Sequence, residues 1–274
     1  MGFGFIYLPI LVLVVYSFNN SRFTGVWQGF TWDWYRVLLT GEGGAFPETV
    51  GFGANGVMHA LGNSLVVAVV TTGVATVLGT TLALGLERGR WPGRVGIEAL
   101  VLLPLVIPGI AQGVSLLVFF TWGFRLWEAW GGGKLTLGLP TVTIGHITFA
   151  ISFVTLVVRA RLAELDPRWE AAAMDLGANP WQTLWRITLP WLTPAIGSGA
   201  LLVFTLSLDD FVVTFFTAGV GATTLPVFVY GMIKFSVTPA INAISTLMLL
   251  ASTLLVLLAW WMQGERGNGK PKEV

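Results

Sequence analysis

The chain has 274 residues and a formal net charge of +1; 54% of its residues are hydrophobic and only 11% are charged. A soluble domain carries about 25% charged residues, so the composition excludes a water-soluble protein and indicates an all-α polytopic membrane protein. The absence of cysteine excludes thiolate metal sites and disulfides. The two histidines, His59 and His146, are too far apart in sequence to indicate a metal site, so no metal is expected.

Six apolar stretches are each predicted to form a transmembrane helix, because each is close to the length that crosses a bilayer. They cover residues Phe3–Phe18, Leu61–Leu86, Ala99–Trp122, Thr141–Val158, Trp191–Thr217 and Ala240–Met262. The first stretch lacks the basic flank and the cleavage site of a signal peptide. We therefore interpret it as a membrane helix whose cytoplasmic end is missing from the sequence, and residues 1–274 as one transmembrane domain.

Lysine and arginine are shared unequally between the two sets of connections. Ten of them lie on the side that includes the C-terminus: Arg88, Arg90, Arg94, Arg159, Arg161, Arg168, Arg186, Arg266, Lys270 and Lys272. Five lie on the opposite side: Arg22, Arg36, Arg125, Lys134 and Lys234. Cytoplasmic loops are the richer in basic residues, so the first side is predicted to be cytoplasmic, together with both termini.

The connection after the first stretch is predicted to contain a short interfacial helix over Phe30–Leu39. Trp34, Val37 and Leu38 would share one apolar face of it at helical spacing. The stretch Gly41–Gly56, which holds six glycines, is expected to be a flexible loop.

Residues 162–190 form a polar connection in which two short helices are predicted. Asp166–Pro167 is typical of a helix start, because Asp caps the free N–H groups and Pro suits the first turn. Gly177 suits the left-handed residue that ends a helix. Asn179–Pro180 starts the second helix in the same way, and Pro190 is expected to end it. Capping alone is equally consistent with a plain linker.

Two adjacent acids, Asp209 and Asp210, interrupt the apolar stretch before Thr217. An ionisable group inside a membrane span is costly, and it usually faces a cavity, a partner or an ion path. Ser207, Asp210 and Thr214 recur at helical spacing, so we expect this stripe to line a substrate pathway. Asp210 would be the main cation contact, with Asp209 packed against a neighbouring helix. The alternative is a structural role, in which both acids cap a helix or pair with a basic residue of another chain.

His146 and the glycines complete the inventory of candidate sites. His146 is expected at the membrane interface, bonded to backbone or water. The glycine-rich stretches lack the Lys-Ser/Thr ending of a phosphate-binding loop, so the chain is not expected to hydrolyse a nucleotide by itself.

The connection over residues 162–190 resembles the coupling loop of ABC-importer permeases, whose pattern is Glu-Ala-Ala, three residues, Gly, nine residues, Ile, one residue and Leu-Pro. The matching positions are Ala172, Ala173, Gly177, Ile187, Leu189 and Pro190. The glutamate departs from the pattern, since Glu170 stands one position early and Ala171 takes its place. The resemblance implies the type I importer permease fold, with a cytoplasmic loop that docks on an ATPase. Either Glu170 covers the family role by a local shift, or Ala171 shows that a salt link is dispensable.

The segment SLDDFVVTFFTAG (Ser207–Gly219), the opening Asn63–Leu65 and the stretch GHITF (Gly145–Phe149) resemble the second permease subunit of spermidine/putrescine importers. This implies a non-catalytic subunit for polyamines or a related small cation, with an opine or amino-acid derivative as the alternative ligand.

The implied partners are a second permease in a heterodimer, an ATPase dimer that hydrolyses Mg-ATP, an extracytoplasmic binding protein and the lipid of a bacterial inner membrane. No cofactor of its own and no nucleic acid are expected. The alternative is a secondary transporter or channel driven by an ion gradient, in which the acid pair would couple to ions.

Overall fold

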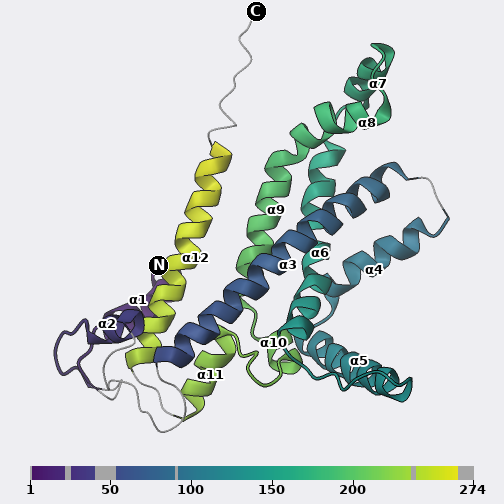
Figure 1. Ribbon diagram of the computed structural model, residues 1–274. Helices are drawn as coiled ribbons and strands as arrows, with labels where there is room; N and C mark the ends of the chain where they lie inside the picture. Colours follow the sequence, from purple (N-terminus) through teal and green to yellow (C-terminus); the bar gives the residue numbers. More distant parts are fainter. Residues whose placement is uncertain (1, 22–25, 41–53, 90–91, 236–238, 265–274) are drawn as a thin grey trace, which may run out of the picture. The chain divides into compact units, whose positions relative to one another are not determined.

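The computed structural model describes residues 2–21, 26–40, 54–89, 92–235 and 239–264, and most of these residues are helical (Figure 1). This confirms the predicted helical architecture. The chain divides into two compact units, residues 1–65 with 221–257 and residues 66–220 with 258–274. The greater part of the predicted glycine-rich loop, residues 41–53, lies outside the described residues, as do Arg22, Arg90, Arg266, Lys270 and Lys272.

The first unit contains α1 (Gly2–Tyr16), α2 (Asp33–Thr40), the beginning of α3 (Ala54–Arg88), α11 (Leu225–Phe235) and α12 (Pro239–Gly264). Its core forms where Trp34, Val37 and Leu38 of α2 are buried with residues of α3, α11 and α12. The predicted apolar face of the interfacial helix is therefore confirmed. The helix begins at Asp33 rather than Phe30, because the Thr31 hydroxyl accepts a bond from the Asp33 N–H at 3.1 Å.

The start of α11 is held by two side chains of α3. The Leu225 N–H donates to Ser64 Oγ at 2.8 Å, and the Asn63 amide donates to the Gly221 and Thr223 carbonyls at 3.0 and 2.9 Å. The bond to Ser64 satisfies an N–H that lacks a partner at a helix start, and the two bonds from Asn63 hold the segment that precedes the helix. The pair Asn63–Ser64 thus joins segments that are far apart in sequence.

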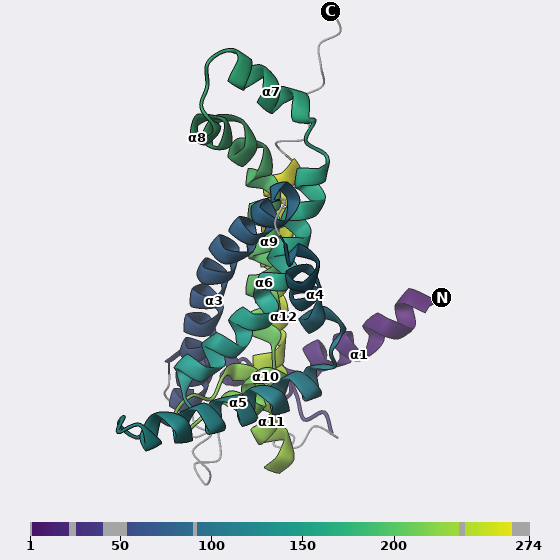
Figure 2. The ribbon, with the colours of Figure 1, turned by 90° about the vertical axis from the view of Figure 1, so that its right-hand side faces the viewer.

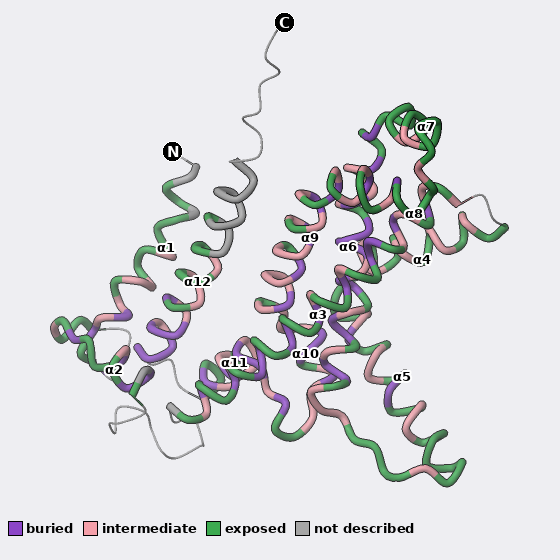
Figure 3. Tube along the Cα trace, turned by 45° about the horizontal axis from the view of Figure 1, so that its top comes forward, coloured by how far each residue is buried: buried purple, intermediate pink, exposed green. Residues whose placement is uncertain are grey.

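The second unit is built around α6 (Leu139–Ala163), which is buried along much of its length (Figure 3). It also contains α4 (Arg94–Val106), α5 (Gly109–Ala129), α7 (Pro167–Asp175), α8 (Pro180–Thr183), the π-helical turn η2 (Leu184–Thr188), α9 (Leu189–Asp209) and α10 (Val212–Thr217). Helices α7 and α8 lie at one end of α6 and α9, whereas α5 and α10 lie at the other (Figures 1 and 2).

Small residues let α3 approach α6 closely. Ala75, Gly79 and Ala83 recur every four residues on α3, and Ala75 and Ala83 belong to one buried cluster with Val154 of α6. The Thr155 hydroxyl donates to the Gly79 carbonyl at 3.3 Å. Such spacing of small residues is typical of tightly packed membrane helices.

Two of the predicted spans are broken rather than continuous. The stretch Ala99–Trp122 divides into α4 and α5, because Pro108 has no N–H to continue the helix. The stretch Trp191–Thr217 divides into α9 and α10 at Asp210, whose backbone is extended. The expectation of one helix in each stretch was wrong, because Pro108 and the acid pair at Asp209 and Asp210 each mark a break inside a mainly hydrophobic stretch.

By length and composition, four helices among the described residues could cross a membrane: Asn55–Arg88, Gly109–Ala129, Leu139–Ala163 and Pro180–Asp209. The first and sixth predicted spans correspond to α1 and α12, in which the described apolar stretches are Tyr7–Tyr16 and Pro239–Leu254. The count of six spans therefore stays a prediction.

The close packing of α3 on α6 predicts that Gly79→Ala destabilises the protein. A Cβ at Gly79 would lie 2.7 Å from Val154 Cβ and 3.1 Å from the Ile151 carbonyl oxygen. Overpacking of this kind costs about 1–3 kcal/mol. The midpoint of thermal unfolding of the purified protein in detergent should fall accordingly.

Gly73→Ala on the same helix is the matched control, because a Cβ there meets nothing within 4 Å. It should leave the midpoint unchanged or raise it, since Ala favours helix over Gly by about 1 kcal/mol. Equal midpoints for the two variants would show that the α3–α6 contact is looser than described.

Candidate functional site

The connection between α6 and α9, residues 164–188, folds as its caps predict. Asp166 Oδ1 accepts a bond from the Arg168 N–H at 2.9 Å and begins α7. Gly177 follows the helix with φ of 90°, a left-handed conformation that favours glycine. Asn179 and Gln182 exchange side-chain to backbone bonds of 2.8 and 3.0 Å and begin α8. The three predicted signals are therefore confirmed.

The second helix of this connection does not end at Pro190. It passes through η2, where the Leu189 N–H bonds to the Leu184 carbonyl, and continues as α9 (Figure 2). A proline in the first turn of a helix has no bond to lose, and a π-turn carries the chain into that turn. The expected stop at Pro190 was wrong for this reason.

Large apolar side chains are exposed on this polar connection. Leu176, next to the left-handed Gly177, is 91% exposed, and Trp169, Met174, Trp181 and Trp185 are each about half exposed or more. Trp181 and Trp185 contact each other edge to face, with ring centroids 5.7 Å apart. A cluster of exposed apolar residues of this size is typical of a surface that binds a partner.

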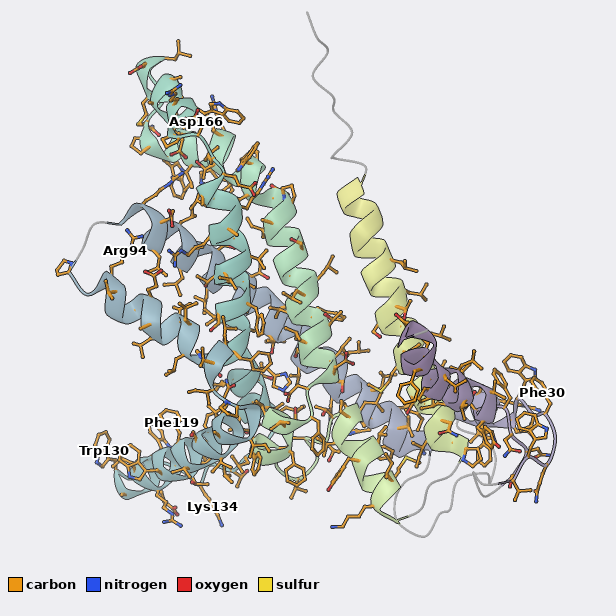
Figure 4. All side chains as sticks on the ribbon, turned by 180° about the vertical axis from the view of Figure 1, so that it is seen from behind. Phe30, Arg94, Phe119, Trp130, Lys134 and Asp166 are labelled. Atoms are coloured by element: carbon orange, nitrogen blue, oxygen red, sulfur yellow. The ribbon has the colours of Figure 1, made fainter. Side chains whose placement is uncertain are left out.

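The predicted coupling residues divide into exposed and inward-facing groups. Ala171, Ala172, Gly177 and Pro190 are exposed, whereas Ala173, Ile187 and Leu189 are half-buried. Glu170 turns back toward its own chain, where its carboxylate accepts bonds from the Arg88 guanidinium of α3 and the Thr188 hydroxyl of η2. Asp166 in Figure 4 marks this end of the unit, opposite Trp130 and Lys134.

A buried polar network centres on His146 of α6, whose side chain is fully buried. Its Nδ1 lies 2.7 Å from Ser207 Oγ, and its Nε2 lies 2.9 Å from Thr214 Oγ1 and 3.2 Å from Asp210 Oδ2. The expectation of an interfacial imidazole was wrong, because α9 and α10 cover this face of α6. The sequence analysis named His146 but not its part in this network, for which its position inside an apolar stretch was the available signal.

The polar stripe therefore faces the interior of the chain. Ser207 and Thr214 are buried, and Asp210 Oδ2 also accepts the Thr214 N–H at 3.0 Å. Asp210 thus caps α10 and bonds to His146 at the same time. Asp209, the last residue of α9, is exposed. Within this chain Asp210 is thus the more buried acid and Asp209 the more exposed one, and the expected roles of the two acids in a substrate pathway stay predictions.

Residues 75–264 match the family model described as binding-protein-dependent transport system inner membrane component. The chain is 39% identical over 275 residues to the putrescine transport system permease protein PotI of Escherichia coli (strain K12), covering 100% of this chain and 92% of that protein. It is 34% identical over 272 residues to the spermidine/putrescine transport system permease protein PotC of the same strain, covering 99% and 94%.

Solved structures share the fold at low sequence identity. A chain of a bacterial ABC transporter involved in the import of the acidic polysaccharide alginate aligns with a TM-score of 0.73 and 18% identity, over 97% of this chain and 91% of that one. A chain of an amino acid ABC transporter aligns with a TM-score of 0.56 and 13% identity, over 76% and 93%.

The buried network predicts that His146→Ala lowers the stability of the fold. The substitution leaves Ser207, Thr214 and Asp210 without a partner that they share, and an unsatisfied buried polar group costs about 1–3 kcal/mol. Unfolding of the purified protein by SDS in mixed micelles should show a loss in this range.

His59→Ala serves as the control, because His59 is the other histidine of the chain and is exposed. It should unfold close to wild type. His146→Gln, which keeps a donor and an acceptor, should lie between wild type and His146→Ala. Wild-type stability of His146→Ala would contradict the network.

Proposed function

Because the chain belongs to the family of binding-protein-dependent transport system inner membrane components, we propose that it is a permease subunit of an ATP-driven importer of polyamines. The observation that carries the proposal is the full-length similarity to putrescine and spermidine/putrescine permeases. The chain itself is non-catalytic. It is a multi-pass protein of the bacterial inner membrane, and both of its termini lie in the cytoplasm.

The exposed acid at the end of α9 is the proposed contact for a cationic substrate. Non-helical backbone inside a membrane is tolerated where it is buried in protein or lines a water-filled cavity, and the chain breaks at Asp210. Asp210 supports that break by capping α10 and bonding to His146. This leaves Asp209 as the carboxylate that can face an amine of the substrate, with Asp210, Ser207 and Thr214 behind it.

The connection between α6 and α9 is the proposed docking element for the ATPase. Its two short helices are well capped, and its exposed tryptophans and Leu176 offer an apolar surface to a groove on a partner. The partner ATPase dimer would bind and hydrolyse Mg-ATP. Its closure would move α7 and α8, and with them α9, so that access alternates between the two sides of the membrane.

The complete transporter would contain a second permease, which forms a heterodimer with this chain, and an extracytoplasmic binding protein that delivers the ligand. A solved relative in this fold was crystallised in complex with its periplasmic protein, which supports such an assembly. The alternative of a transporter driven by an ion gradient has no support among the relatives. An opine or amino-acid derivative stays the alternative ligand, and binding of a panel of these compounds to the cognate binding protein distinguishes it from polyamines.

The placement of the two acids predicts that Asp209→Asn impairs transport more than Asp210→Asn does. Loss of one charged contact should lower putrescine uptake by at least about tenfold, which corresponds to ~1.4 kcal/mol. Uptake is measured with the complete transporter in proteoliposomes and expressed per folded transporter.

Asp210→Asn should instead lower the yield of folded protein, because Asp210 caps α10, while the surviving transporters keep most of their uptake. Near-native uptake in Asp209→Asn, or a larger loss per folded transporter in Asp210→Asn, would remove Asp209 as the substrate contact.

The left-handed Gly177 predicts that a β-branched residue uncouples the transporter. Gly177→Val would strain the backbone at φ of 90°, by about 1–3 kcal/mol, and would tilt α8 against α7. The ratio of ligand transported to ATP hydrolysed should fall. Gly177→Asn is the control, because Asn tolerates left-handed backbone, and it should stay closer to wild type. Normal coupling in Gly177→Val would show that this break is not needed.

A further inference from the structure

A chain of five charged side chains and one hydroxyl runs across the cytoplasmic end proposed for the second unit. It links α4, α6, α3, α7 and η2 through Glu98, Arg159, Glu87, Arg88, Glu170 and Thr188. Glu87 and Arg88 are the last two residues of α3, and each pairs in a different direction. We call these six residues the charged relay.

One half of the charged relay joins α3 to α6 and α4. Arg159 of α6 donates through Nη1 to Glu98 Oε1 at 2.6 Å and through Nε to Glu87 Oε2 at 3.4 Å. All three side chains are about one-quarter to one-third exposed. The end of α3 is therefore tied to both helices by one guanidinium.

The other half joins α3 to the connection between α6 and α9. The Arg88 guanidinium donates to Glu170 Oε1 and, at 3.2 Å, to Thr188 Oγ1, while the Thr188 hydroxyl donates to the same Glu170 oxygen. Thr188 is fully buried and Glu170 is 19% exposed. The carboxylate is thus engaged by two donors from two elements of its own chain.

The residues of α7 that follow Glu170 differ from it in exposure. Ala171 occupies the position of the family glutamate and is exposed, as is Asp175 at the end of α7. A surface that docks on a partner consists of such exposed groups, whereas Glu170 is turned the other way. The side-chain bonds of Glu170 join α7 to α3 and η2.

We infer that Glu170 is a positioning residue, which transmits the movement of α7 to α3 through Arg88 instead of contacting the ATPase. Arg159 then extends the same movement to α4 and α6. This inference rests on the proposed function, because it concerns how the docking element drives the membrane helices. An exposed ion pair adds little to stability, but this pair shares a buried hydroxyl and links helices that are far apart in the sequence.

The test is a charge exchange in the complete transporter, reconstituted with its second permease, ATPase and binding protein. Glu170→Arg and Arg88→Glu should each retain the ATPase but lower the ligand transported per ATP hydrolysed by at least about fivefold, the low end of coupling effects between sites. The double variant restores an ion pair with its charges reversed, and its ratio should return to within about twofold of wild type, since contacting residues are not additive.

Asp175→Arg is the matched control, because it makes the same change of charge at an exposed position of α7. Because Asp175 is exposed on the proposed docking surface, any loss of coupling that it causes should not be reversed by Arg88→Glu. Loss of the ATPase on purification of Glu170→Arg, with no rescue by Arg88→Glu, would overturn the inference and show that Glu170 contacts the ATPase.

Protease cleavage within residues 164–188 of the purified chain tests the charged relay without any transport. The single variants should be cleaved faster than wild type, and the double variant should be protected again. Unchanged cleavage in the single variants would also overturn the inference. If wild type shows no ATP-dependent uptake while the cleavage pattern holds, the proposed function fails and the positioning of α7 by Glu170 stands.

Discussion

A bilayer offers no water to the backbone, so each helix break in this chain needs a partner group from elsewhere in the fold. The chain meets this constraint with side chains. Asp210 receives the Thr214 N–H at the start of α10, and Ser64 receives the Leu225 N–H at the start of α11. Asp166 and Asn179 do the same for α7 and α8 outside the apolar stretches. Polar residues that look functional in the sequence therefore have a structural role, which is to accept backbone N–H groups at the starts of helices.

The same constraint separates the two acids of α9. Asp210 bonds to α10 and to His146. Asp209 is therefore the acid that remains for the proposed contact with a substrate at the break between α9 and α10. The connection that bears the exposed tryptophans joins the other end of the same helix, since α9 runs without interruption from Leu189 to Asp209. A helix of this length spans about 30 Å. One rigid element can therefore carry a displacement from the proposed docking surface to the proposed substrate contact.

Local signals were predictable from the sequence and contacts over long distances were not. Asp166, Gly177 and Asn179 act on residues within one turn, so their effects follow from the adjacent sequence, and all three were confirmed. The break at Asp210 and the burial of His146 depend on each other across two helices, and the local sequence around either residue does not show which segment lies against it. The inward turn of Glu170 likewise depends on Arg88, which is far away in the sequence. Pro190 was misread because a proline ends a helix or begins one according to what precedes it.

The π-helical turn at Leu184–Thr188 has a geometric consequence for the whole of α9. A π-turn holds one more residue than an α-turn, and one residue corresponds to about 100° of rotation around a helix. The turn therefore sets the azimuth of α9 relative to α8. On either side of this turn, Leu192, Val203 and Ser207 are buried in the unit, while Trp181 is exposed, as is Trp185 within the turn. The five residues of η2 therefore fix the direction of the exposed face of the connection relative to the buried face of α9.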